Sequence, residues 1–177
     1  IMVSVADTVM VGKLGVIPLA GATFATAIYH VFMLFGLGVS YAITPLVATT
    51  KSTDKKKRLI FLQNGLLVNT LLALTMSIII LVLAPYLPFF GQERLVTAAA
   101  TSYLKIITIS LIPLMIFQTF RQFSEGQSNT LSPMIVSVLA NLLNVLLNYV
   151  LIYGHWGFSE IGLNGAGYAT LISRFVM

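Results

Sequence analysis

One acidic residue lies where a carboxylate is costly. Asp7 is flanked by apolar side chains in residues 1–15, IMVSVADTVMVGKLG, whereas the other acidic residues lie in or beside polar connections. An ionisable group in lipid costs roughly 2.5–3.5 kcal/mol on insertion scales, and such groups usually mark ion or substrate paths. Asp7 could therefore exchange a proton or bind a sodium ion. Alternatively, it could be a structural carboxylate that neighbouring hydroxyl groups such as that of Thr8 satisfy.

Three asparagines follow one another at helical spacing in the segment ANLLNVLLNYVLIYG. Asn141, Asn144 and Asn148 are three and four residues apart, which places them on one face of a helix. An amide group both donates and accepts hydrogen bonds, so a row of amides in lipid must face protein or water. Two interpretations stay open: the row bonds one helix to another, or it forms the wall of a polar cavity.

Other polar residues add little chemistry of their own. The glycine-rich segment 162–170 follows no strand and lacks GxGxxG spacing, so we expect tight helix packing rather than phosphate binding. Thr170 and Ser173 could add hydroxyl groups to a cavity, and we expect His30 to be a satisfied polar core residue rather than a proton relay. The sequence offers no nucleophile–base pair, metal-ligand cluster or paired catalytic carboxylates. We therefore predict that the protein is not an enzyme and needs no cofactor.

The amino-acid composition indicates whether these residues lie in a membrane protein or in a soluble one. Hydrophobic residues make up 58% of the chain and charged residues only 8%, against about 25% charged residues in soluble domains. A soluble surface would need more charges, so we predict a polytopic membrane protein. The net charge of +5 does not indicate nucleic-acid binding, because the basic residues gather in one short loop without interleaved aromatics. The absence of cysteine excludes disulfides and thiol catalysis.

The apolar runs are too long for the short strands of a membrane barrel, so the fold class predicted is all-α, a transmembrane helical bundle. Gly36, Gly38 and Pro45 offer places to bend or pack closely, and Pro113 predicts a kink. The expected spans are residues 1–11, 18–50, 59–83, 95–123, 131–153 and a sixth from 163 onward.

The connections indicate an orientation. Residues 51–58 hold five of the ten basic residues, which is typical of a cytoplasmic loop. Counting spans alternately puts the connection 121–132 on the same side and the connection 154–162 outside. Tyr86, Phe89 and Phe90 near two prolines fit an interfacial belt on the outer side.

Several blocks together resemble the multidrug and toxic compound extrusion (MATE) family. They are residues 7–15 (DTVMVGKLG), 44–45 (TP), 120–127 (FRQFSEGQ), 141–149 (NLLNVLLNY) and 162–173. The blocks come in the family's order and at its spacing across the whole chain. Each block is weak alone, but jointly they are specific.

The resemblance implies a fold and an activity. The family has twelve helices in two six-helix lobes and exports cationic and amphipathic drugs in exchange for protons or sodium. Residues 1–177 would then form most of the amino-terminal lobe: the end of helix 1, helices 2–5 and the start of helix 6. We expect a multi-pass protein of the plasma (inner) membrane that is monomeric at full length, with small-molecule drugs and lipid as its partners.

The resemblance also implies site residues. Asp7 matches the coupling carboxylate of this lobe, Asn144 and Asn148 match polar positions on the fifth helix, and Thr170 matches more loosely on the sixth. Asn141, Tyr149 and Ser173 are candidates for the substrate cavity. Some members carry an acidic residue in the fifth helix where this chain has asparagine, which leaves Asp7 as the acid inside the lobe.

Two other functions stay open. A lipid-linked glycan flippase of the same superfamily would need several cations to hold a pyrophosphate, and only Lys105, Arg121 and Arg174 lie in or near spans. A structural or receptor-like membrane subunit would be supported if Asp7 lay in a packed, dry site.

Overall fold

The computed structural model describes residues 2–51, 53–154 and 160–177, and side chains within those ranges from Asp7 onward. Ile1, expected to begin the first span, and the middle of the expected outer connection 154–162 lie outside the described residues. In the described part every regular element is a helix, which confirms the all-α fold class. The elements are α1 (Met2–Gly12), α2 (Val16–Tyr41), α3 (Ile43–Ala48), α4 (Lys55–Leu83), the 3₁₀ helix η1 (Ala84–Phe90), α5 (Arg94–Ile109), α6 (Leu111–Gly126), α7 (Leu131–Tyr153) and α8 (Leu163–Val176).

Among the described residues, four helical segments are long and apolar enough to cross a membrane: Val16–Ala48, Lys55–Phe90, Arg94–Gly126 and Leu131–Tyr153. A bilayer crossing needs about 20 apolar residues in a helix. The chain is therefore a multi-pass membrane protein. The bounds of α7 agree with the expected span 131–153, whereas α4 begins four residues before the expected start because Asp54 caps it by accepting a hydrogen bond from the Lys57 amide.

Two of the crossing segments are each divided by a proline. The α2 helix ends at Tyr41 and α5 ends at Ile109, in each case four residues before a proline, Pro45 or Pro113. A proline has no N–H to donate to the carbonyl four residues earlier, so the helix breaks there. The expected kink near Pro113 is confirmed as a break at Ser110. Gly36 does not bend α2 but allows close packing, because a Cβ there would lie 2.8 Å from Met115 Sδ.

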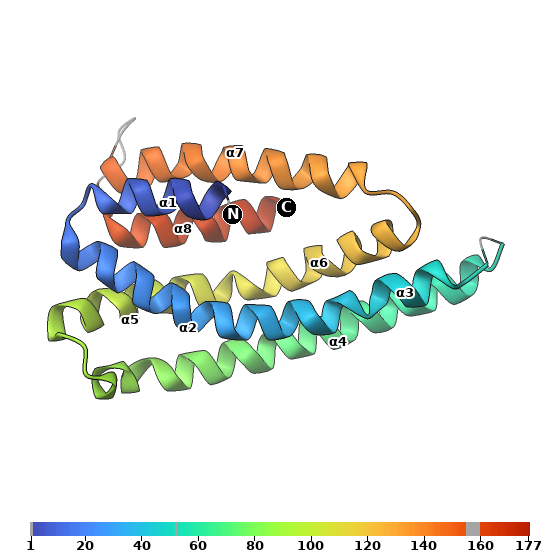
Figure 1. Ribbon diagram of the computed structural model, residues 1–177, viewed down its shortest axis with the longest axis horizontal. Helices are drawn as coiled ribbons and strands as arrows, with labels where there is room; N and C mark the ends of the chain where they lie inside the picture. The colour runs from blue at the N-terminus through green and yellow to red at the C-terminus, as the bar shows by residue number, and fades with distance from the viewer. Residues whose placement is uncertain (1, 52, 155–159) are drawn as a thin grey trace.

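The helices form two groups (Figure 1). In one, α7 and α8 pack together and α1 lies against α7; in the other, α2 packs along α5 and α4 packs along α6. The two groups meet where α8 packs against α5. Small residues allow the backbones to approach: a Cβ on Gly165 of α8 would lie 2.5 Å from the Leu151 carbonyl oxygen of α7. This agrees with the tight packing expected for residues 162–170.

The connections divide between the two ends of the bundle. Figure 1 shows the α3–α4 and α6–α7 connections at one end, and the α1–α2 and η1–α5 connections at the other. The connections 51–58 and 121–132 thus lie at the same end of the bundle, as the alternate counting of spans predicts. The expected loop 121–132 is shorter than predicted, because α6 continues to Gly126 and an ion pair of 2.7 Å joins Arg121 to Glu125 on its last turns.

The close approach at Gly165 generates a test of the packing. Replacing Gly165 with alanine should lower the midpoint of thermal unfolding of the full-length protein in detergent, because the new Cβ would overlap the Leu151 backbone. Overpacking of this kind costs about 1–3 kcal/mol. Gly38→Ala is the matched control, since nothing lies within 4 Å of its Cβ position and alanine gains about 1 kcal/mol of helix propensity over glycine. Equal midpoints for the two variants would contradict the α7–α8 packing.

Candidate functional site

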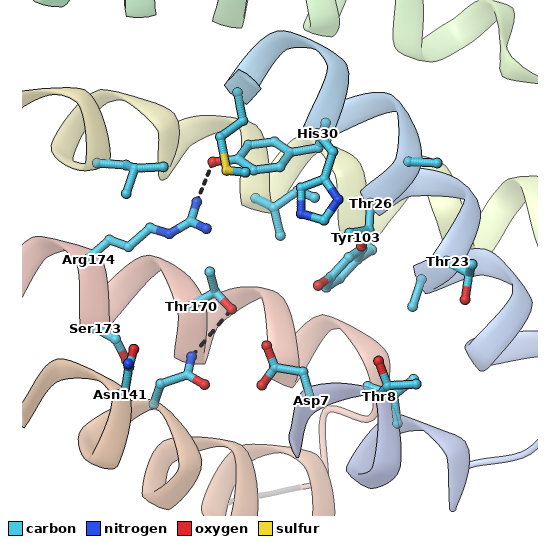
Figure 2. Close-up of a pocket in the computed structure, with 18 of the residues that line it drawn as sticks. Asp7, Thr8, Thr23, Thr26, His30, Tyr103, Asn141, Thr170, Ser173 and Arg174 are labelled. Atoms are coloured by element: carbon cyan, nitrogen blue, oxygen red, sulfur yellow. Dashed lines mark hydrogen bonds between the residues drawn. The ribbon is translucent and has the colours of Figure 1, made fainter. Parts of the chain in front are cut away.

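A cavity of about 590 Å³ lies between the two groups of helices. Its wall combines apolar side chains such as Leu19, Met33 and Ile107 with a large number of polar ones (Figure 2). The polar lining residues are Asp7, Thr8, Thr23, Thr26, Tyr29, His30, Tyr103, Asn141, Asn144, Thr170, Ser173 and Arg174.

Asp7 reaches the cavity from α1, and its carboxylate points into the open space (Figure 2). Asn148 on α7 donates a hydrogen bond from its Nδ2 to Asp7 Oδ1. Two further contacts fix α1: Val11, one turn beyond Asp7, is 2% exposed, and the Tyr153 hydroxyl donates to the Met10 carbonyl at 2.9 Å. The carboxylate is thus held by α7 while one side faces the cavity.

The asparagine row connects Asp7 to α8. Asn148 Nδ2 lies 3.2 Å from Asn144 Oδ1, and Asn144 Nδ2 lies 3.4 Å from Thr170 Oγ1. Asn148 is fully buried behind Asp7, whereas Asn141 and Asn144 line the cavity. Both interpretations of the row therefore hold: Asn148 and Asn144 bond helices together, and Asn141 and Asn144 also form a cavity wall.

One acceptor in this network has no partner. Asn148 Oδ1 is buried and receives no hydrogen bond from the described residues. A buried amide oxygen normally finds a donor, so Asn148 Oδ1 is the exception within this network, although Asn148 itself does not line the cavity. The described residues contain no group of three or more His, Cys, Asp or Glu side chains that could hold a transition metal.

The remaining sequence candidates differ in their positions. Ser173 lines the cavity, but its hydroxyl donates to the Ala169 carbonyl at 2.6 Å on the same helix. Tyr149 lies apart from this cavity. Its side chain is 49% exposed, and its ring centroid is 6.2 Å from that of Tyr153.

Sequence reasoning missed one wall of the cavity. Thr23, Thr26 and His30 on α2 all line it (Figure 2). The expectation that His30 is a core residue is wrong, because His30 is exposed beside the cavity. The spacing of three and four residues among these polar side chains was the available signal.

The role of Arg174 on α8 was also missed from the sequence. Its Nη1 donates to the Tyr29 hydroxyl and, at 2.7 Å, to Ser110 Oγ at the break between α5 and α6. The guanidinium carbon also lies 5.3 Å from the centroid of the Tyr29 ring, within the range of a cation–π contact. A single arginine within an apolar segment was the feature of the sequence that could have indicated this role.

Comparison with known proteins places the chain among transporters. The multidrug resistance protein NorM of Photobacterium profundum is 30% identical over 172 residues, 97% of this chain and 38% of that protein. The probable multidrug resistance protein NorM of Rhizobium meliloti is 33% identical over 170 residues, 96% of this chain and 36% of that protein. The chain thus spans less than two-fifths of the length of these relatives.

Solved structures share the fold. The eukaryotic MATE transporter AtDTX14 superimposes with a TM-score of 0.88 at 21% identity, over 98% of this chain and 38% of that one. A multidrug resistance MATE family transporter of the MOP superfamily, solved in an inward-facing conformation, superimposes with a TM-score of 0.86 at 22% identity. The profile of the MatE family matches residues 1–150. The chain, with its helical fold and polar cavity between the helices, belongs to the MatE family of transporters.

Proposed function

We propose that the full-length protein is a secondary active exporter of cationic and amphipathic drugs, driven by proton or sodium antiport through Asp7. The observation that carries this proposal is the carboxylate directed into the cavity and tied by Asn148 to an amide and hydroxyl network. Intramembrane acids that face a cavity mark ion and substrate paths. The names of the NorM relatives, which are multidrug resistance proteins, agree with it.

The site chemistry suits a proton or a hard monovalent cation. The oxygens that could bind a cation are the Asp7 carboxylate and the Thr170 hydroxyl in the cavity lining, and Oδ1 of Asn148, a residue that is bonded to Asp7 and whose Oδ1 receives no hydrogen bond from the described residues. Carboxylate, carbonyl and hydroxyl oxygens suit hard cations, and a carboxylate also accepts a proton. We infer that Asp7, Asn144, Asn148 and Thr170 hold the coupling ion, and that Asn141 and Ser173 contact substrate.

Coupling follows if ion and drug stabilise different conformations. A ligand shifts a conformational equilibrium only by its difference in affinity for the two states, so equal affinity shifts nothing. A cation that neutralises Asp7 would favour a lobe closed around the carboxylate and would displace the drug. The mixed apolar and polar wall of the cavity suits amphipathic molecules.

We further propose that residues 1–177 form most of the amino-terminal lobe of a twelve-helix protein that is monomeric in the plasma membrane. The chain covers 38% of the NorM relative and of the AtDTX14 structure, which supports a lobe of a longer protein. The α3–α4 and α6–α7 connections share one end of the bundle, which supports the alternation of its spans. Residues 51–58, with five Lys or Arg, would be cytoplasmic.

The alternatives are less well supported. A flippase that holds a pyrophosphate needs several cations in its cavity, and the described lining has one Lys or Arg, Arg174. A structural subunit would need a packed, dry environment for Asp7, and a cavity of about 590 Å³ argues against it.

Replacing Asp7 with asparagine tests the coupling role. Asp7→Asn keeps the shape and the amide contacts but removes the ionisable group, so gradient-driven export of ethidium by the full-length protein in vesicles should be lost. The control is Asp54→Asn, an exposed helix cap whose function asparagine preserves. Export by the Asp7 variant at the wild-type rate would refute the proposal. Separate proton and sodium gradients identify the ion.

Replacing Asn148 with alanine tests the network. The change removes the donor to Asp7, and a hydrogen bond to a charged group contributes about 1.5–3 kcal/mol. We expect coupled export per folded molecule to fall about tenfold or more, measured as the initial rate under a fixed gradient.

The matched control for Asn148 is Asn69→Ala. Asn69 is also buried and donates to Thr119 Oγ1 at 2.7 Å, but its partner lies outside the cavity. If both variants lost export equally, the Asn148 effect would be one of folding rather than of coupling.

A further inference from the structure

A permanent positive charge stands in the same cavity as Asp7. Arg174 extends from α8 across the cavity, on the other side of Thr170 from Asp7 (Figure 2). Arginine stays protonated in proteins, whereas a carboxylate can be neutralised by a proton or a bound cation. The cavity therefore holds one fixed charge and one variable charge of opposite sign.

Among the residues that the structure describes, the groups that contact Arg174 directly carry no negative charge. The guanidinium is held by the hydroxyl groups of Tyr29 and Ser110 and by the face of the Tyr29 ring, all of them neutral. Within the described residues its nitrogens form no ion pair with a carboxylate, and the salt bridge present there joins Arg121 to Glu125 at the end of α6. An intramembrane charge is costly and is normally paired. Asp7 is the carboxylate that faces Arg174 across open space.

The other titratable groups around the cavity are His30 and Tyr29 from α2 and Tyr103 from α5. The lining charge with Asp7 ionised and His30 neutral is zero, and one bound cation raises it to +1. A second cation would raise it further inside a medium of low dielectric constant, where repulsion between like charges is strong. Without Arg174, the first cation would instead bring the cavity to neutrality.

We propose that Arg174 is a specificity-determining residue whose fixed charge limits the cavity to one cation at a time. The coupling ion and a cationic drug then exclude each other electrostatically, whether or not their binding positions overlap. The consequence for transport rests on the proposed function. The effect of the charge on cation binding can be measured independently of transport.

A purely structural role is the competing explanation. Arg174 ties α8 to α2 and to the α5–α6 break, so its loss could simply loosen the bundle. The charge effect and the structural role predict different results for two substitutions. Arg174→Lys keeps the charge but loses the planar fork, whereas Arg174→Gln loses the charge but keeps hydrogen-bond donors.

The experiment measures ethidium binding to the purified full-length protein by fluorescence, with and without added sodium and at two pH values, at constant ionic strength. Arg174→Gln should tighten ethidium binding by roughly threefold to tenfold and should weaken its competition with the coupling cation. Arg174→Lys should bind like the wild type. Lys105→Gln, which removes an exposed cation that does not line the cavity, is the control.

A double variant separates this inference from the proposed function. Asp7→Asn leaves the lining with an unbalanced positive charge and should weaken ethidium binding, and adding Arg174→Gln should restore it. If Asp7→Asn still exported normally while Arg174→Gln tightened binding, the proposed coupling would fail and the charge effect would stand.

Two results would overturn the proposed charge effect of Arg174. Wild-type affinity in Arg174→Gln, or the same change in Arg174→Lys as in Arg174→Gln, would refute the charge effect. Thermal unfolding is measured for each variant. If Arg174→Gln does not fold, Arg174→Met, which keeps the packing of the apolar stem, takes its place with the same expected tightening.

Discussion

The structure depends on how a carboxylate is accommodated among apolar helices. Asp7 in α1 is held by the Asn148 amide of α7, which is itself fully buried and bonded onward to Asn144 and Thr170. These hydrogen bonds connect α1, near the start of the sequence, to α7 and α8, near its end. An ionised group at this depth is stable only with such partners or with access to water. The cavity beside Asp7 gives its carboxylate room for water.

The helix packing explains why a cavity exists there. Close approaches at glycines bring α8 against α7 and α2 against α5. The cavity separates the polar faces of α2 and α8 except where Arg174 reaches the Tyr29 hydroxyl. The proline-linked break at Ser110 does not line the cavity, but it places a buried hydroxyl group within hydrogen-bond distance of Arg174. Backbone irregularity at membrane depth is tolerated where it is buried in protein or lines a cavity.

Much of the fold could be predicted from the sequence, because long apolar runs bounded by polar residues or glycine leave few alternatives. The bounds of α7 are an example. Asp7 and the asparagine row were recognisable because polar groups are rare in lipid. The roles of Arg174 and His30 were not, since they depend on how α2 and α8 are rotated toward each other. Sequence periodicity gives the faces of one helix, but not which face of another helix lies opposite.

The most direct test of this account asks whether the Asp7 carboxyl group is reachable and changes state with its ligand. Dicyclohexylcarbodiimide enters membranes and reacts with protonated carboxyl groups, and mass spectrometry of the peptide locates the adduct. We expect Asp7 in the full-length protein to be labelled, and we expect saturating ethidium to suppress the labelling. If ethidium did not change the labelling of Asp7, or if Asp7 did not react at any pH, the proposed role of this carboxyl group would be contradicted.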